Sequence, residues 1–299
     1  SGHNGLVGSA IVRKLRYEGF ENIITVSKAD LDLTNTNEVE RFFSENTIEY
    51  VFDAAAKVGG IYANDTYPAE FIYQNTMIQN NLINSSFKNN IKKFLFLGSV
   101  CIYPKFAPNP VKEESLLCGE LEPTNEAYAI SKIHGIHLLK AYNKQYGFKC
   151  VSLMPCNLYG PNDNFHPLNS HVIPALIRKF HFAGDGPVEC WGDGSPSREF
   201  MYVDDLADAC LFSISNYQDA ELVNISSGEN IKIKNLAESI SKITGYKGSI
   251  TWDKTKPNGT PDRPLDCSRI SSLGWRPKYT LQKGLEESYE WFKENYKHR

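Results

Sequence analysis

The residues best suited to proton transfer are a tyrosine and a lysine four positions apart, Tyr128 and Lys132. They fall in a stretch predicted to be helical, 127–146, so the two side chains should lie about one turn apart on one face. A nearby ammonium favours a phenolate, and we therefore expect Lys132 to lower the pKa of Tyr128 from its ordinary value of about 10. Such a phenol can donate or accept a proton near neutral pH. The same spacing also occurs by chance on helices, so the surroundings must decide its meaning.

The composition excludes several classes of function. The chain has 299 residues, 41% of them hydrophobic and 22% charged, as in ordinary globular proteins of one or two domains. A formal net charge of −3 gives no reason to expect nucleic acid or an anionic membrane as partner. No apolar run reaches the roughly 20 residues of a membrane-spanning helix, and no signal peptide is seen. The seven cysteines lack disulfide or metal-site spacing, so we expect no metal and a cytoplasmic setting.

A glycine-rich motif opens the chain. Gly2, Gly5 and Gly8 have the spacing G-x-x-G-x-x-G and precede a helical pattern. Such a turn lets the backbone approach a pyrophosphate, which the N-terminus of the following helix binds. A strand usually comes before the turn, so we infer one of about five to seven residues upstream of residue 1. The motif predicts dinucleotide binding.

The nature of the dinucleotide is indicated by a second strand, which we predict at 22–26, with Lys28 just after it. In NAD-specific sites an Asp or Glu near this place binds the ribose 2′-hydroxyl, whereas a 2′-phosphate needs a cation. Lys28 therefore favours NADP, although Asp30 and Asp32 follow closely.

The order of elements predicts an α/β fold with a doubly wound parallel sheet of Rossmann type. Buried strands are expected at 50–56, 93–97, 151–155 and 222–225, with long helices at 68–89 and 127–146. Ligands bind at the carboxyl ends of such strands, which places Ser99 beside a cofactor and within reach of Tyr128. Further on the pattern is less regular, and 189–194 is expected to be a hairpin or turn. We expect a cofactor domain of 1–160 with a returning stretch at about 199–227, and a smaller mixed substrate lobe of 161–198 and 228–299.

The motifs taken together carry a family resemblance. The glycine motif, the strand end at 53–56, Ser99 and the Tyr128-x-x-x-Lys132 pair resemble the extended short-chain dehydrogenase/reductase family. More narrowly, 54–61, 98–104, 157–165 and 171–174 resemble the GDP-L-fucose synthase family of GDP-4-keto-6-deoxymannose 3,5-epimerase/4-reductases. The resemblance covers nearly the whole chain, from Gly2 to about Tyr296.

The resemblance implies reduction by NADPH at C4 of a GDP-4-keto-6-deoxy sugar, with 3,5-epimerisation, giving GDP-L-fucose or a close analogue. Ser99 and Tyr128 would bind the C4 oxygen, Tyr128 would protonate it, and Lys132 would hold the nicotinamide ribose. Cys101 and His171 match the family's base and acid for epimerisation at C3 and C5.

The resemblance also implies binding residues. Those expected around NADP(H) are Gly2, Asn4, Gly5, Leu6, Val7, Gly8, Lys28, Asp32, Leu33, Ala54, Ala55, Leu97, Gly98, Lys132, Pro155, Asn157, Leu158 and His171. Those expected to bind the nucleotide sugar are Lys179, Trp191, Arg198 and Asp266, because cations hold a diphosphate and an aromatic stacks on a base. Asp262 departs from the family, which has a basic residue there, and Asn4 stands where some members have arginine.

Two alternatives remain open. The first is a C4 reductase of another GDP-4-keto sugar, such as a GDP-heptose, with little or no epimerase activity. The second is a non-catalytic NADP-sensing protein, which would be expected to lack Tyr128 or Lys132, whereas this chain has both. The family also implies a homodimer through helices 68–89 and 127–146, and a role in making a capsule or surface-glycan precursor.

Overall fold

The computed structural model describes residues 1–167, 169–256 and 262–296. Its elements in chain order are α1 (Leu6–Tyr17), α2 (Thr36–Glu45), β1 (Tyr50–Asp53), α3 (Ile61–Thr66), α4 (Pro68–Lys88), β2 (Lys93–Leu97), η1 (Val100–Ile102), η2 (Glu113–Ser115), η3 (Pro123–Asn125), α5 (Glu126–Tyr146), β3 (Cys150–Pro155), β4 (Asn157–Tyr159), α6 (Val172–Phe182), β5 (Val188–Trp191), β6 (Ser197–Tyr202), α7 (Val203–Asn216), β7 (Leu222–Ile225), β8 (Asn230–Lys232), α8 (Ile233–Thr244), β9 (Ile250–Asp253), α9 (Ser268–Ser272) and α10 (Leu281–Asn295).

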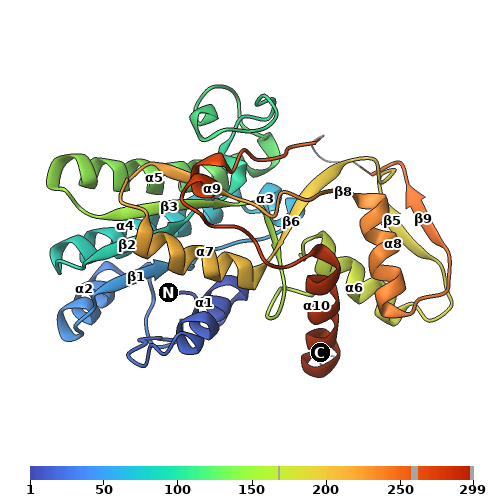
Figure 1. The fold of residues 1–299 in the computed structure, drawn as a ribbon, viewed down its shortest axis with the longest axis horizontal. Coiled ribbons are helices and arrows are strands. Elements are labelled where there is room, and N and C mark those ends of the chain that lie inside the picture. The colour runs from blue at the N-terminus through green and yellow to red at the C-terminus, as the bar shows by residue number, and fades with distance from the viewer. Residues whose placement is uncertain (168, 257–261, 297–299) are drawn as a thin grey trace.

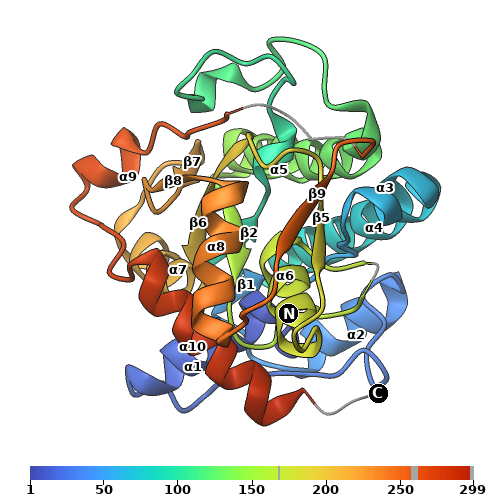
Figure 2. The same ribbon diagram turned by 90° about the vertical axis from the view of Figure 1, so that its right-hand side faces the viewer.

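A four-stranded parallel sheet in the order β1-β2-β3-β7 forms the centre of the structure. Every residue of β2 and β3 is buried, as expected of parallel strands covered on both faces. Helices α4 and α5 pack together on one side of the sheet, and α1 and α7 lie on the other (Figures 1 and 2). The predicted α/β fold with a doubly wound parallel sheet is confirmed.

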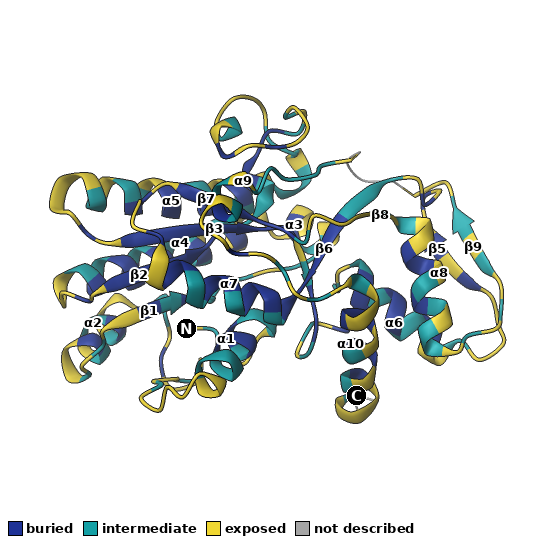
Figure 3. Cartoon of the chain, in the orientation of Figure 1, coloured by how far each residue is buried: buried dark blue, intermediate teal, exposed yellow. Residues whose placement is uncertain are grey.

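Two hydrophobic cores lie on the two faces of this sheet. One joins α1 and α7 to β3 and β7 through residues such as Ile11 and Leu206. The other joins α2, α4 and α5 to β1 and β2 through residues such as Phe43 and Leu139. The buried residues follow the strands and the inward sides of the helices (Figure 3).

A third core lies among α6, α8, α10 and the short strands. There β6 pairs with β4 in parallel and with β8 in antiparallel fashion, and β5 pairs in parallel with β9. The turn or hairpin predicted at 189–194 is wrong for its first three residues, because they belong to the strand β5. Its partner β9 lies so far along the chain that local sequence does not reveal the pairing. The predicted domain boundaries stay a prediction.

The strand predicted at 22–26 is also wrong. This segment has no strand pairing, and the side chain of Ile24 is 48% exposed. Apolar residues form a strand only beside a hydrogen-bonded neighbour, whereas β1, at the sheet edge, pairs with β2 alone among the described strands. The strand predicted at 50–56 ends earlier, at Asp53.

Within the described ranges, no helix has the length and apolar character needed to cross a membrane. The same residues contain no group of three or more His, Cys, Asp or Glu arranged to hold a metal ion.

Candidate active site

The glycine motif forms a tight turn at the N-terminus of α1. The Gly5 amide donates to the Gly2 carbonyl oxygen at 3.1 Å, and Gly2 has a φ of +70°. A Cβ on Gly8 would lie 2.1 Å from the Gly2 oxygen, and one on Gly2 would lie 2.5 Å from the Ala54 oxygen. The backbone is therefore too close for side chains, and the first amides of α1 face an open cradle that fits a pyrophosphate.

One large cleft, of about 2600 Å³, runs from this turn along the carboxyl ends of the strands. It is lined by all the residues expected around the cofactor: Gly2, Asn4, Gly5, Leu6, Val7, Gly8, Lys28, Asp32, Leu33, Ala54, Ala55, Leu97, Gly98, Lys132, Pro155, Asn157, Leu158 and His171. The volume exceeds the roughly 300–1,000 Å³ of a usual ligand pocket, because the cleft continues along the open edge of β1 between Val51 and Ile24. The glycine turn and the end of β2 thus share one cleft, while their binding roles stay a prediction.

Lys28 lines the far end of this cleft. The nearby Asp32 carboxylate accepts hydrogen bonds from the Thr34 amide and hydroxyl at 2.9 and 2.8 Å. These bonds, and then the charge of Lys28, lower the pKa of Asp32. The carboxylate is thus engaged by its own loop, which fits the expectation that Lys28 provides the cation for a 2′-phosphate.

Ser99, Cys101 and Tyr128 come together where β2 ends and α5 begins. Ser99 is the N-cap of η1, and its Oγ accepts the Cys101 amide at 3.5 Å. Burial raises the pKa of the Cys101 thiol to about 11, while a hydrogen bond with Ser99 and the charges of Lys132 and Arg263 lower it. Ser99 and Tyr128 both line the cleft, and the Tyr128 ring packs edge-on against Phe71 with centroids 6.2 Å apart.

Lys132 is buried behind Tyr128. Its Nζ donates to the Leu97 carbonyl oxygen at 2.8 Å and lies 5.9 Å from the centroid of the Tyr128 ring. Burial lowers the pKa of Lys132, and the charge of the buried Asp53 opposes this by raising it. The ammonium is thus directed mainly to the strand ends.

The expected lowering of the Tyr128 pKa by Lys132 is wrong for this structure. Burial raises the pKa of the phenol well above its ordinary value, and the charge of Cys101 raises it further. The spacing of the two residues gave the correct helix face, but it carried no information on burial or on the carbonyl group that binds the ammonium. Tyr128 therefore holds its proton in this state.

His171 lies directly before α6 and lines the same cleft as Ser99 and Tyr128. A histidine at this place often caps its helix, yet among the described residues its ring makes no capping hydrogen bond. Burial lowers the pKa of its imidazole. The ring is thus available at the cleft wall.

The four expected substrate residues lie outside this cleft within the described part of the chain. Lys179 of α6 donates to the Glu189 carbonyl oxygen at 2.8 Å, and Trp191, 61% exposed, ends the same strand β5. Arg198 lies on β6, where burial and then the charge of Arg263 lower its pKa.

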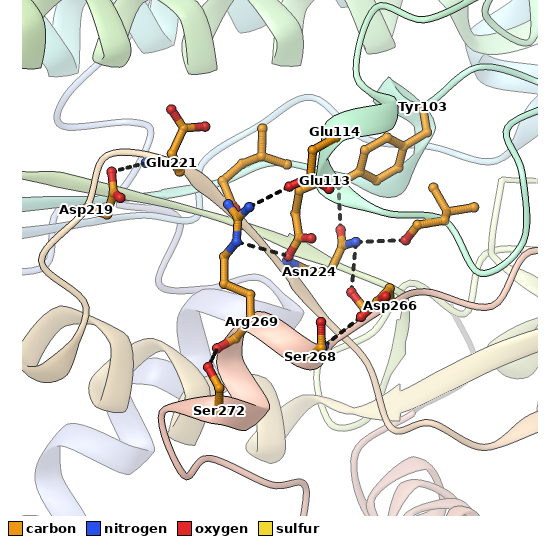
Figure 4. A network of polar contacts seen from close by, with 12 residues as sticks. Tyr103, Glu113, Glu114, Asp219, Glu221, Asn224, Asp266, Ser268, Arg269 and Ser272 are labelled. Carbon is orange, nitrogen blue, oxygen red and sulfur yellow. Dashed lines mark hydrogen bonds and ion pairs between the residues drawn. The ribbon is translucent and has the colours of Figure 1, made fainter.

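Asp266 is placed differently from the other three. Its carboxylate accepts the Ser268 amide at 2.8 Å, and its carbonyl oxygen accepts from the Asn224 side chain at 3.2 Å. Figure 4 shows it within a polar network around Asn224 and Arg269. The predicted substrate contacts stay a prediction.

The profile of the NAD dependent epimerase/dehydratase family matches residues 1–226. The chain belongs to this family. GDP-L-fucose synthase 1 of Arabidopsis thaliana is 55% identical over 298 residues, which is 99% of this chain and 92% of that protein. The resemblance to the GDP-L-fucose synthases is thereby confirmed.

Solved structures of family members are similar over the full length. A GDP-6-OMe-4-keto-L-xylo-heptose reductase from Campylobacter jejuni has a TM-score of 0.94 at 37% identity, covering 99% of this chain and 97% of that one. The GDP-mannoheptose C4 reductase MlghC of Campylobacter jejuni, with NADP bound, has a TM-score of 0.91 at 39% identity, covering 98% and 96%.

Two residues of the site were not predicted from the sequence of this epimerase/dehydratase family member. Asp53 is only 1% exposed and acts on Lys132; a single Asp at the end of an apolar strand was the signal for it. The charge of Arg263 lowers the pKa of Cys101, and no local pattern indicated this interaction.

Proposed function

We propose that the chain is an NADP(H)-dependent oxidoreductase and isomerase that epimerises C3 and C5 of a GDP-4-keto-6-deoxy sugar and reduces C4, giving GDP-L-fucose or a close analogue. The observation that carries the proposal is the meeting of Ser99, Tyr128 and Lys132 with the glycine turn in one cleft. The 55% identity to a GDP-L-fucose synthase supports the choice of substrate.

The cofactor is proposed to be NADP(H), as in the NADP-bound heptose reductase of similar structure. The glycine turn would hold its pyrophosphate and Lys28 its 2′-phosphate. When bound, the nicotinamide supplies a hydride to C4 of the sugar.

In the reduction, Tyr128 would donate its proton to the C4 oxygen while Ser99 donates a hydrogen bond to the same atom. Burial raises the pKa of Tyr128, so the phenol carries the proton that this direction of reaction requires. Lys132, about one turn away on the same helix, is proposed to hold the nicotinamide ribose.

In the epimerisation, the Cys101 thiolate would accept the proton from C3 or C5, and His171 would deliver one to the opposite face of the ring. The negative charge moves to the C4 oxygen, where Ser99 and Tyr128 donate hydrogen bonds to it. The same two donors thus serve both reactions.

The GDP part would be bound outside the large cleft. Arg198 and Lys179 are proposed to hold the diphosphate, and Trp191 offers an exposed ring on which the base could stack. Asp266 is proposed to bind the ribose or base, for which its carboxylate would have to share its bond with the Ser268 amide.

The test is hydrogen exchange without reduction. GDP-4-keto-6-deoxymannose is incubated with the enzyme in deuterated water in the absence of NADPH, and deuterium is located by NMR. We expect deuterium at C3 and C5, lost in Cys101→Ser and retained in the matched control Cys118→Ser, since Cys118 is exposed and is not among the residues that line the cleft. Intact C4 reduction without any exchange would contradict the epimerase half of the proposal.

A second candidate is a C4 reductase of another GDP-4-keto sugar with little or no epimerisation. It is favoured by the TM-score of 0.94 to a heptose reductase. A panel of GDP-4-keto-hexoses and GDP-4-keto-heptoses, with NADPH oxidation as readout, separates the two. Higher kcat/KM for a heptose, without exchange at C3 and C5, would decide for this alternative.

We also propose a homodimer in the cytoplasm that contributes to a capsule or surface-glycan precursor. The dimer would form through α4 and α5, which expose Tyr73 (65%) and Ile130 (41%). The cofactor domain of 1–160 with 199–227, and the substrate lobe of 161–198 and 228–299, are proposed as its two parts. Sedimentation of wild type and Ile130→Asp tests the interface.

A further inference from the structure

Arg263 is bound to the stretch of backbone that follows Cys101. Its Nη2 donates to the carbonyl oxygens of Tyr103 and Pro104 at 3.2 and 3.0 Å. Tyr103 is only 1% exposed, and its hydroxyl donates to Asn224 Oδ1 at 2.6 Å. The guanidinium is therefore held against rigid backbone immediately beyond η1, the turn that carries Cys101.

The thiol of Cys101 faces charged groups from two directions. Lys132 acts on it from α5, and Arg263 acts on it from the C-terminal segment. Tyr128, also on α5, is a neighbouring acidic group, and the charge of the thiolate raises its pKa. Two cations from separate elements thus oppose the effect of burial on Cys101.

Within the described ranges of the chain, Arg263 forms no ion pair. Its guanidinium stays protonated, as arginine does in proteins. Burial lowers the pKa of Arg263, and the charges of Cys101 and Glu122 raise it, but the Glu122 carboxylate is bound to Lys105 at 3.1 Å. Asp262, next in the chain, acts instead on Arg198. The positive charge of the guanidinium therefore acts on the Cys101 thiol and lowers its pKa.

We propose that Arg263 is a positioning residue for Cys101, fixing the turn that carries the thiol and supplying positive charge that stabilises its thiolate. The inference rests on the proposed epimerisation, in which the thiolate is the base. Because burial raises the pKa of the thiol to about 11, most of it is protonated at neutral pH. A charge that favours the thiolate therefore raises the fraction of Cys101 that can accept a proton.

The test measures the thiol itself and needs no substrate. Wild type and the variants Arg263→Met, Arg263→Gln and Arg263→Lys are alkylated with iodoacetamide between pH 7.5 and 10, and the rate at each cysteine is followed by peptide mass spectrometry. Cys118, which is exposed, is the internal reference in the same digest. Arg276→Gln is the control for loss of an arginine, because Arg276 binds the carbonyl of Trp275 away from the site.

We expect Cys101 in both neutral variants to react about three- to tenfold more slowly than in wild type, with its pH profile shifted upward. Arg263→Lys should restore most of the rate, and Cys118 should be unaffected. Arg263→Gln serves as the second neutral variant in case Arg263→Met does not fold, because the glutamine amide can still donate a hydrogen bond to a backbone carbonyl. An unchanged pH profile of Cys101 in a folded neutral variant overturns the proposal.

A catalytic readout separates this inference from the proposed function. In the neutral variants deuterium exchange at C3 and C5 should fall more than C4 reduction. If wild type shows no exchange at all, the epimerase proposal fails, while the alkylation result still decides whether Arg263 acts on Cys101.

Discussion

Lys132 Nζ donates a hydrogen bond to the carbonyl oxygen of Leu97 at 2.8 Å. The bond directs the ammonium from α5 to the carboxyl end of β2, and the charge of the buried Asp53, at the end of β1, raises the pKa of Lys132 against the effect of burial. Lys132 is therefore fixed between two strand ends, with its Nζ also 4.8 Å from the centroid of the Phe96 ring. A cation held in this way is preorganised to stabilise negative charge on its neighbours.

Replacing Lys132 by methionine should lower kcat/KM for C4 reduction by at least about 100-fold, because the bound cofactor loses the fixed cation proposed to hold its nicotinamide ribose. The measurement is NADPH oxidation with a GDP-4-keto sugar, together with NADPH binding by fluorescence. The control is Lys140→Met on the same helix, whose Nζ binds Glu221 at 2.6 Å on the surface. Equal activity of the two variants would contradict the role of Lys132.

The glycine turn yields a prediction that separates folding from binding. A Cβ on Gly8 would meet the Gly2 oxygen at 2.1 Å, whereas one on Gly5 would lie 3.5 Å from that oxygen. Gly8→Ala should therefore lower the free energy of unfolding by about 1–3 kcal/mol, and Gly5→Ala should change it by less than about 0.5 kcal/mol.

Urea unfolding measures the stability of both variants, and titration with NADPH measures their binding. Gly5 is the N-cap of α1, where backbone approaches a pyrophosphate most closely. Gly5→Ala should thus keep the fold yet bind NADPH at least about tenfold more weakly. Normal binding by a folded Gly5→Ala would show that the pyrophosphate lies elsewhere.

The parts of the site that could be predicted from the sequence are those whose contacts lie within one element or follow from strand order. The four-residue spacing placed Tyr128 and Lys132 on one helix face, and strand order brought Ser99 to the same cleft. The direction of the Tyr128 pKa shift could not be predicted in this way, because burial is produced by packing such as that of Phe71 against the tyrosine ring. Spacing alone carries no measure of burial.

Contacts between distant segments were beyond prediction. Arg263 and Tyr103 are 160 positions apart, and no local pattern connects them. The strand expected at 22–26 failed for a related reason, since strand formation depends on a neighbour that hydrogen-bonds to it. Pairing partners and charge neighbours are properties of the whole fold.

The network around Asn224 should stabilise the loop that follows η1 (Figure 4). Asn224 is fully buried; its Oδ1 accepts from Tyr103 at 2.6 Å and its Nδ2 donates to the Val111 carbonyl at 3.0 Å. Asn224→Ala leaves these groups buried and unpaired, which should lower the free energy of unfolding by about 2–4 kcal/mol.

Urea denaturation checks this value, with Asn216→Ala as control, because Asn216 is exposed and binds only the Phe212 carbonyl of its own helix. The control should differ from wild type by less than about 0.5 kcal/mol. If Asn224→Ala also lowered the free energy of unfolding by less than about 0.5 kcal/mol, water or a shifted side chain would have replaced the lost hydrogen bonds.

Asp163 should make the stability of the protein depend on pH. Its Oδ1 accepts the Asn164 amide at 2.7 Å, while its Oδ2 is buried without a hydrogen-bond partner among the described residues. Burial raises the pKa of this carboxyl to about 7, compared with about 3.9 in an unfolded chain. The folded state therefore binds the proton more tightly than the unfolded state does.

The stabilising contribution of protonated Asp163 is complete below about pH 4 and is lost as the pH rises to about 7. Asp163→Asn keeps an oxygen that accepts the Asn164 amide and cannot ionise. Its free energy of unfolding should therefore increase relative to that of wild type as the pH rises. Between pH 5 and pH 8 its advantage in the free energy of unfolding should grow by about 2–3 kcal/mol. Urea unfolding at both values measures it, with the exposed Asp185→Asn as control. A difference that stays constant with pH would mean that Asp163 titrates as it does in the unfolded chain.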